Sequence, residues 1–168
     1  MRRRALIALL ATAVACPTLL QAQEQDVIVY LVRHAERAED GTNDPPISRE
    51  GQDRSTLLAS MLVDAGLTDI HTTDYRRTRQ TGAPTEAVTG LTARTYNPRD
   101  LQGFAAQLRS SPGRHLVLGH SNTTPELVSA LGGTPHGAIE EMEYDRLYMV
   151  VISGESVNTI LLRFGEPY

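Results

Sequence analysis

The chain has 168 residues, a length typical of one domain with a sizeable hydrophobic core. Its 16 basic residues are all arginine and 20 residues are acidic, so the formal net charge is −4. Residues 1–22 hold three of the arginines and no acid; without them 13 basic residues face 20 acidic ones, and a net charge of −7 argues against nucleic acid as a general partner. No cysteine follows Cys16, which excludes an internal disulfide and a thiolate metal site from the rest of the chain.

Residues 1–22 have the pattern of a secretory signal peptide. A basic start precedes the apolar segment "ALIALLATAVA", and small residues offer a cleavage site after Ala22. The apolar segment is short for a membrane span. We therefore predict export to the periplasm or the medium, a domain at 23–168 and no stable membrane span after cleavage. The alternatives are an uncleaved anchor and a lipoprotein signal that ends at Cys16.

Hydrophobic patterns predict strands that alternate with helices. The β-branched run "VIVYLV" (27–32) is typical of a strand buried on both faces, and Ser48 can cap a helix that runs to about Asp64. The elements expected next are a strand at 67–73, a helix reaching 85–88, a helix at 98–110, a strand at 115–119, a helix at 123–133 with Thr123 and Glu126 in capping-box register, and a hairpin of 146–153 and 156–164. This order predicts an α/β protein: a three-layer α/β/α sandwich with a mostly parallel central sheet.

Polar side chains follow the buried strands of this sheet. Arg33 and His34 end the first strand, and His120 and Asn122 follow the strand at 115–119. Ligands of open α/β sheets bind beyond the carboxyl ends of the strands, so the two histidines should face one crevice if their strands are neighbours. The segment "RRTR" (76–79) follows the third strand, and helical geometry allows one or two of its arginines to face a single ligand.

This set of residue types suits phosphoryl transfer. The guanidinium fork of arginine matches phosphate oxygens, and neutral imidazole is a nucleophile near neutral pH. Fixed cationic donors stabilise the charge that spreads over the oxygens in the transition state. The helix start at Thr123 adds backbone N–H groups. The scheme needs no metal or other cofactor.

Three segments together resemble a known family. "LVRHAE", "TDYRRTRQT" and "VLGHSNT", in this order, are similar to the motifs of the histidine phosphatase (phosphoglycerate-mutase-like) superfamily, in the manner of a small branch 1 member. The resemblance runs from about Val27 to Val151. It implies that His34 is the residue phosphorylated, that Arg33 binds the phosphoryl group and that His120 is a cationic stabiliser of that group.

The middle motif selects one arginine. The family pattern is a small hydroxyl residue, an arginine four positions on and a threonine four positions after that, which Thr73, Arg77 and Thr81 satisfy. The resemblance therefore implies that Arg77 is the phosphate ligand among residues 76–79. Asn122, two residues after the late histidine, can also reach the phosphoryl group.

The proton donor is not fixed by the motifs. One branch of the family has an acid directly after the late histidine, where this chain has Ser121. The mutase-like branch has a glutamate between the middle arginine and the late histidine, a segment that offers Glu86 and Asp100. Glu36 is the acid nearest to His34 in sequence and is our candidate, with Glu86, Asp100 or no donor as the alternatives.

The sequence thus predicts a metal-independent phosphoric monoester hydrolase that acts on a small phosphorylated substrate through a phosphohistidine on His34. One alternative is a phosphate-binding module without activity. A second is a serine hydrolase, because "GHSNT" places Ser121 one residue short of a nucleophile elbow. The remaining histidines, His71, His115 and His136, show no metal-ligand spacing.

Overall fold

The computed structural model describes residues 26–167. The predicted signal peptide, with Ala22 and Cys16, lies outside the described residues, so its cleavage and the export of the domain stay predictions. Within residues 26–167, no helix has both the length and the apolar character needed to cross a membrane.

Six strands form one sheet in the order β3-β2-β4-β1-β5-β6. The first four of these pair in parallel, and the last two run antiparallel to their neighbours. The elements in chain order are β1 (Val27–Arg33), α1 (Arg49–Leu62), β2 (Asp69–Thr72), α2 (Arg76–Thr89), β3 (Arg94–Thr95), α3 (Leu101–Arg109), β4 (Gly113–Gly119), α4 (Thr123–Ala130), β5 (Arg146–Ser153) and β6 (Ser156–Arg163). The mostly parallel sheet and the closing hairpin are confirmed.

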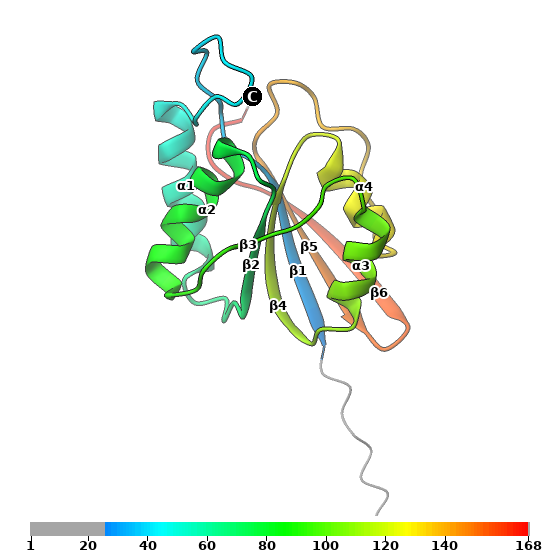
Figure 1. Cartoon of the computed structure of the whole chain (residues 1–168). Coiled ribbons are helices and arrows are strands. Elements are labelled where there is room, and N and C mark those ends of the chain that lie inside the picture. The colour runs from blue at the N-terminus through cyan, green and yellow to red at the C-terminus, as the bar shows by residue number, and fades with distance from the viewer. Residues whose placement is uncertain (1–25, 168) are drawn as a thin grey trace, which may run out of the picture.

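Helices cover both faces of the sheet. Helices α1 and α2 lie on one side, and α3 and α4 lie on the other (Figure 1). Alternate residues of β4 supply the two cores: Val117 packs with residues of α3 and α4, whereas Leu116 and Leu118 pack with residues of α1. Because a strand points successive side chains to opposite faces, a continuous apolar run is required where both faces are covered. This is the three-layer α/β/α sandwich that the sequence predicts.

The sequence predicts the start of α1 correctly but not the capping of α4. Ser48 caps α1 as predicted, since its side chain accepts a hydrogen bond from Gly51 N at 3.2 Å. Helix α4 begins at Thr123 with Asn122 as its N-cap residue, so the predicted capping box at Thr123 is wrong. The Thr123 hydroxyl instead accepts a hydrogen bond from His120 N at 2.9 Å, which fixes the turn after β4.

Candidate active site

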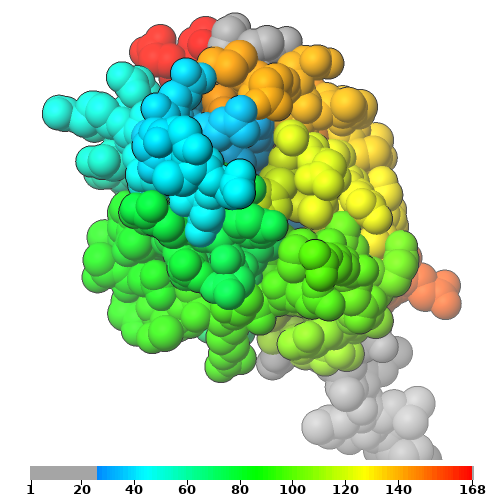
Figure 2. Space-filling model, turned by 45° about the horizontal axis from the view of Figure 1, so that its top comes forward, coloured from blue at the N-terminus to red at the C-terminus, as the bar shows by residue number. Residues whose placement is uncertain are grey.

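The central strands β1 and β4 bring the two motif histidines together. Arg33 lies opposite Gly119 in the parallel register, and His34 N donates a hydrogen bond to Gly119 O at 2.9 Å. The rings of His34 and His120 therefore meet edge to face, with centroids 5.4 Å apart. The carboxyl ends of these strands open on the face shown in Figure 2, where segments from several parts of the chain meet.

A cavity of about 360 Å³ lies at this edge of the sheet. Five residues proposed from the sequence line it: Arg33, His34, Arg77, His120 and Asn122. They come from the end of β1 and the residue that follows it, from the first turn of α2 and from the turn between β4 and α4. The structure thus places three distant segments around one cavity.

His34 is held as a neutral imidazole with a defined tautomer. Its Nδ1 lies 2.8 Å from Ala35 O, a carbonyl that can only accept, so Nδ1 carries the hydrogen and Nε2 has the free lone pair. Burial lowers the pKa of His34 to about 3, aided by the charges of Arg33 and Arg77 and by His120, while the Ala35 carbonyl acts in the opposite direction. A neutral ring with an unprotonated Nε2 is the form that can attack phosphorus.

Hydrogen bonds also orient His120. Arg77 Nη2 lies 3.4 Å from Nδ1 of His120, and Thr73 Oγ1 lies 3.0 Å from its Nε2. Because a guanidinium can only donate, Nδ1 is the acceptor and Nε2 carries the hydrogen that Thr73 accepts. Burial, together with the charges of Arg77 and Arg33, lowers the pKa of His120 to about 4. The ring is therefore neutral at neutral pH when no anion is bound.

The threonines of the middle motif tie α2 to the site. Thr81 Oγ1 accepts a hydrogen bond from Ala35 N at 2.9 Å and donates to Arg77 O at 2.7 Å. Thr73 contacts His120, as described above. The spacing of the motif thus has a physical reason: its first residue orients one histidine, its last residue fixes the backbone beside the other, and Arg77 lies between them.

Arg77 is the arginine of residues 76–79 that faces the cavity. Its guanidinium stacks on the Tyr75 ring at 4.4 Å, and its Nη1 lies 3.5 Å from Asp44 Oδ1. Asp44 also accepts hydrogen bonds from Arg76 N at 3.0 and 3.2 Å, so this loop carboxylate caps α2. The side chain of Arg79 pairs with Asp74 outside the cavity.

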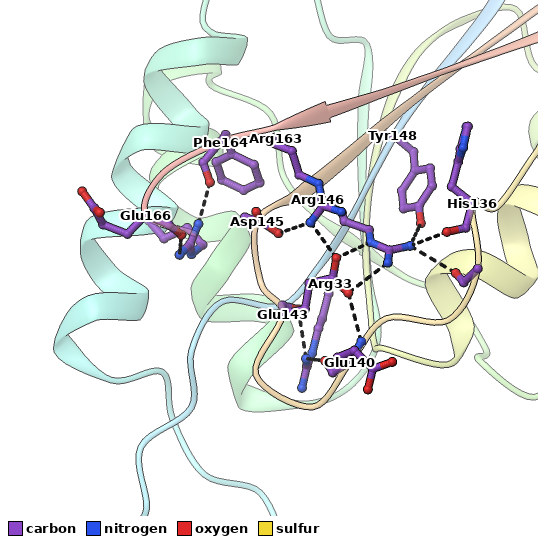
Figure 3. A network of polar contacts seen from close by, with 12 residues as sticks. Arg33, His136, Glu140, Glu143, Asp145, Arg146, Tyr148, Arg163, Phe164 and Glu166 are labelled. Carbon is purple, nitrogen blue, oxygen red and sulfur yellow. Dashed lines mark hydrogen bonds and ion pairs between the residues drawn. The ribbon is translucent and has the colours of Figure 1, made fainter. Parts of the chain in front are cut away.

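Arg33 is held by the segment between α4 and β5, and Figure 3 shows the surrounding network. Its Nη1 donates to three backbone carbonyls, those of Glu140 at 2.9 Å, Glu141 at 2.7 Å and Glu143 at 3.0 Å. The guanidinium lies 4.1 Å from the centre of the Tyr144 ring. Because one end of the fork is fixed in this carbonyl cradle, the rest of the guanidinium is directed at the cavity that Arg33 lines.

A buried ion-pair network supports the carbonyl cradle. Glu143, 2% exposed, accepts hydrogen bonds from Arg146 at 2.6 and 3.0 Å, from Arg163 at 2.6 Å and from Glu140 N at 3.0 Å. Burial by itself raises the pKa of Glu143, but these hydrogen bonds outweigh it and lower the pKa to about 2. The carboxylate therefore stays ionised and keeps the segment beside Arg33 in one conformation.

Glu36, the candidate proton donor, points away from the two histidines. Its Oε1 lies 2.8 Å from Arg54 Nη2, and the side chain borders a different cavity next to α1. The other two acids weighed from the sequence also have structural contacts elsewhere: Glu86 accepts from Ala93 N at 2.6 Å, and Asp100 caps α3 by accepting from Gly103 N at 3.0 Å. None of the three carboxyl groups lines the cavity of His34.

Sequence reasoning missed an acid and two aromatic rings near the site. Among the residues that the structure describes, Glu141 is the one carboxyl group that lines the cavity. Tyr144 supports Arg33, and Tyr75 supports both Arg77 and His120, whose ring centroid lies 5.1 Å from that of Tyr75. The acidic cluster in "IEEMEYD" (139–145) was the signal for Glu141, although it carries no motif.

The other buried histidines form a separate pair. His71 Nε2 lies 3.3 Å from His115 Nδ1, and His115 Nε2 lies 2.8 Å from Ser111 O. Burial, followed by the effect of His115, lowers the pKa of His71 to about 4. Over residues 26–167 there is no group of three or more histidine, cysteine, aspartate or glutamate side chains arranged to hold a metal ion.

Ser121 lines the cavity, but the contacts of a serine nucleophile are lacking. Across the described part of the chain, no hydrogen bond joins its hydroxyl to a histidine, so no base is in place to activate it. Nothing in this geometry favours the serine hydrolase alternative.

Comparison with known proteins agrees with this geometry. The model of the histidine phosphatase superfamily (branch 1) matches residues 29–102. A mycobacterial glucosyl-3-phosphoglycerate phosphatase has the same fold, with a TM-score of 0.62, 15% identity and coverage of 83% of this chain and 99% of that one. The protein histidine phosphatase SixA, solved with tungstate, gives a TM-score of 0.63 and 20% identity, over 80% of this chain and 94% of that one. Comparison with curated proteins gave no match.

The fold and the site together define an α/β protein built to handle phosphoryl groups. Its fold agrees with the solved phosphatases over most of their length, and the segment that matches the family model contains Arg33, His34 and Arg77. The chain therefore resembles the branch 1 histidine phosphatases in its sequence over residues 29–102 and in its fold over most of its length.

Proposed function

We propose that this protein is an exported, metal-independent phosphatase that hydrolyses phosphate monoesters through a phosphohistidine on His34. The observation that carries the proposal is the meeting of Arg33, His34, Arg77 and His120 around one cavity, although they come from three separate segments. Two guanidinium groups and two imidazoles form a site for an anion with a nucleophile at its centre.

In the first step, His34 Nε2 attacks the phosphorus atom and the alcohol leaves. Arg33 and Arg77 hold the phosphoryl oxygens, whose negative charge is spread over them in the transition state. Both guanidinium groups are fixed before the substrate arrives, Arg33 by backbone carbonyls and Arg77 by Tyr75 and Asp44. Little reorganisation is needed during the reaction, which is the condition under which such donors act most strongly.

His120 changes its charge with the ligand. Without an anion, burial and the arginines hold its pKa at about 4. A bound phosphoryl dianion favours the charged form of a nearby imidazole and raises its pKa. His120 thereby becomes a cation when the phosphoryl group is present, as the role of a cationic stabiliser requires. In the second step water attacks the phosphohistidine and releases inorganic phosphate.

The substrate that we propose is a small phosphorylated molecule outside the cytoplasm. Of the two solved structures named above, one is a glucosyl-3-phosphoglycerate phosphatase and the other a protein histidine phosphatase. We propose a small phosphate ester for this chain, and a cavity of about 360 Å³ is large enough to enclose its phosphoryl group with part of a small leaving group. Extracytoplasmic substrates follow from the predicted signal peptide.

Release of inorganic phosphate from a panel of phosphate esters tests the proposal. We expect turnover that EDTA and a serine-directed fluorophosphonate leave unchanged and that the His34→Ala variant lacks. Loss of activity in EDTA would identify a metal phosphoesterase instead, and inactivation by the fluorophosphonate would favour Ser121. A chain that binds phosphate but turns over no ester would be the inactive binding module.

A further inference from the structure

We propose that Glu141 is the proton donor and acceptor of the reaction, a role that rests on the proposed phosphohistidine mechanism. The mechanism needs a group that protonates the leaving oxygen. Glu36, Glu86 and Asp100 all lie outside the cavity of His34. Glu141 reaches this cavity from the segment between α4 and β5, far from the three motifs in sequence.

The backbone of Glu141 is anchored at the phosphate ligand itself. Its carbonyl accepts the shortest of the three hydrogen bonds that Arg33 Nη1 donates, at 2.7 Å. The backbone of Glu141 therefore lies next to the guanidinium that we propose as a phosphate ligand. The rest of this guanidinium faces the cavity, so the side chain of Glu141 starts beside the phosphate ligand and reaches the wall of the same cavity.

The anchoring segment is rigid. Glu143 N donates to Glu140 O at 3.0 Å, which closes a turn around Glu141. The buried carboxylate of Glu143 stabilises the turn, because it accepts hydrogen bonds from Glu140 N and from Arg146. A carboxyl group on such a segment keeps its place relative to Arg33, whereas one on an unsupported loop does not.

The carboxyl group of Glu141 is accessible to a leaving group from the solvent side. Its side chain is 65% exposed and its one ionic partner in the described structure is Arg37, also on the cavity wall, at 2.8 Å. A phosphoryl dianion that enters the cavity competes for Arg37 and places a like charge next to the carboxylate. The ion pair between Glu141 and Arg37 is therefore expected to open when a phosphoryl group is bound, which leaves the carboxyl group of Glu141 at the cavity wall.

The proton balance closes over the two steps. As the bond between Nε2 of His34 and phosphorus forms, the bond from phosphorus to the leaving oxygen breaks, and that oxygen takes the proton of Glu141. Water then forms a bond to phosphorus, the phosphorus–nitrogen bond breaks with its electrons returning to the imidazole, and the Glu141 carboxylate accepts the proton of the water. The carboxyl group ends as it began.

The dependence of the rate on the leaving group tests this role. A proton donor matters for an alkoxide and hardly at all for p-nitrophenolate, which leaves as an anion. For the Glu141→Gln variant we expect kcat/KM for an alkyl phosphate to fall by about 10²-fold or more, and that for p-nitrophenyl phosphate by less than about threefold. Glu126→Gln is the matched control, because it removes an exposed carboxylate from the first turn of α4, outside the cavity. Its kcat/KM values for the alkyl phosphate and for p-nitrophenyl phosphate should both stay unchanged.

Two results would overturn the assignment. Equal losses for both substrates in Glu141→Gln would show a role in binding or folding, and no loss for either would show no role at all. In both cases labelling of His34 in the wild-type protein by a radioactive phosphate ester would leave the phosphohistidine mechanism intact. Absence of that label would instead overturn the proposed function, and the role of Glu141 with it.

Discussion

Arg77→Ala is the substitution that best separates a phosphate ligand from its neighbours. The side chain of Arg77 is 16% exposed, lines the cavity and lies 3.4 Å from His120 Nδ1. Arg76, one residue earlier on α2, is exposed, and its contact with Asp44 is made by its backbone N–H. The variants Arg76→Ala and Arg77→Ala remove the same charge from the same helix turn, so they differ only in the direction of the side chain that is lost.

The structure sets the size of the effect. Removing one fixed donor to a developing oxyanion costs about 2.7–4 kcal/mol, or about 10²–10³ in rate. The loss of Arg77 also frees Asp44, 3.5 Å from its Nη1, to repel the incoming phosphoryl group. The fall should therefore lie at the upper end of this range. Arg77→Lys keeps the charge but loses the planar fork, so an intermediate loss is expected.

Steady-state hydrolysis of p-nitrophenyl phosphate measures these effects as kcat/KM. Thermal denaturation controls for unfolding. The variants Arg76→Ala, Arg77→Ala and Arg77→Lys should all keep the wild-type melting temperature within a few degrees. We expect Arg76→Ala to retain nearly full activity. A large loss in Arg76→Ala together with a small loss in Arg77→Ala would refute the placement of Arg77 at the phosphoryl group.

Three further results are expected for stability. Three histidines, His34, His71 and His120, have pKa values of about 3 or 4 and bind protons in the unfolded chain below pH 6.5 but not in the folded protein. The free energy of unfolding is therefore full above pH 6.5 and falls as the pH drops towards 4, by up to about 1.4 kcal/mol per pH unit for each histidine. Urea denaturation should show this slope flattened in His71→Gln, and an unchanged slope would contradict it. Glu143→Ala leaves Arg146 buried without its partner and should cost about 3–5 kcal/mol in the same assay, which a loss below about 1 kcal/mol would exclude. Gly51→Ala places a Cβ 2.4 Å from Glu36 O, so we expect α1 to shift at a cost of about 1–3 kcal/mol, and a variant as stable as wild type would disprove the close approach.

The sheet was predictable because its pattern is local. Buried apolar runs identify β1 and β4, and strand-end residues in a parallel sheet gather at one edge, which places His34 beside His120. The two-residue strand β3 was not predictable, since Arg94 and Thr95 are both exposed and carry no hydrophobic alternation. A strand this short is defined by its neighbour β2 and not by its own sequence.

The acids show where sequence reasoning ends. Glu36 is two residues from His34, yet its carboxylate turns to Arg54 on α1, because the direction of a side chain depends on packing and not on distance along the chain. Glu141 lies 107 residues from His34 in an irregular segment and reaches the site through backbone contacts with Arg33. Any residue type can supply a backbone carbonyl, so these contacts impose no sequence motif from which Glu141 could be identified.

The most direct test of the phosphohistidine mechanism is the position of a trapped phosphoryl group. The wild-type protein is quenched during turnover of a labelled phosphate ester, and the modified residue and ring nitrogen are identified in its peptides. Because Nδ1 of His34 donates to Ala35 O at 2.8 Å, we predict an acid-labile, alkali-stable phosphoryl group on Nε2 of His34 that His34→Ala lacks. Label on Nδ1 or on another residue, or rapid turnover that never yields label, would contradict the mechanism.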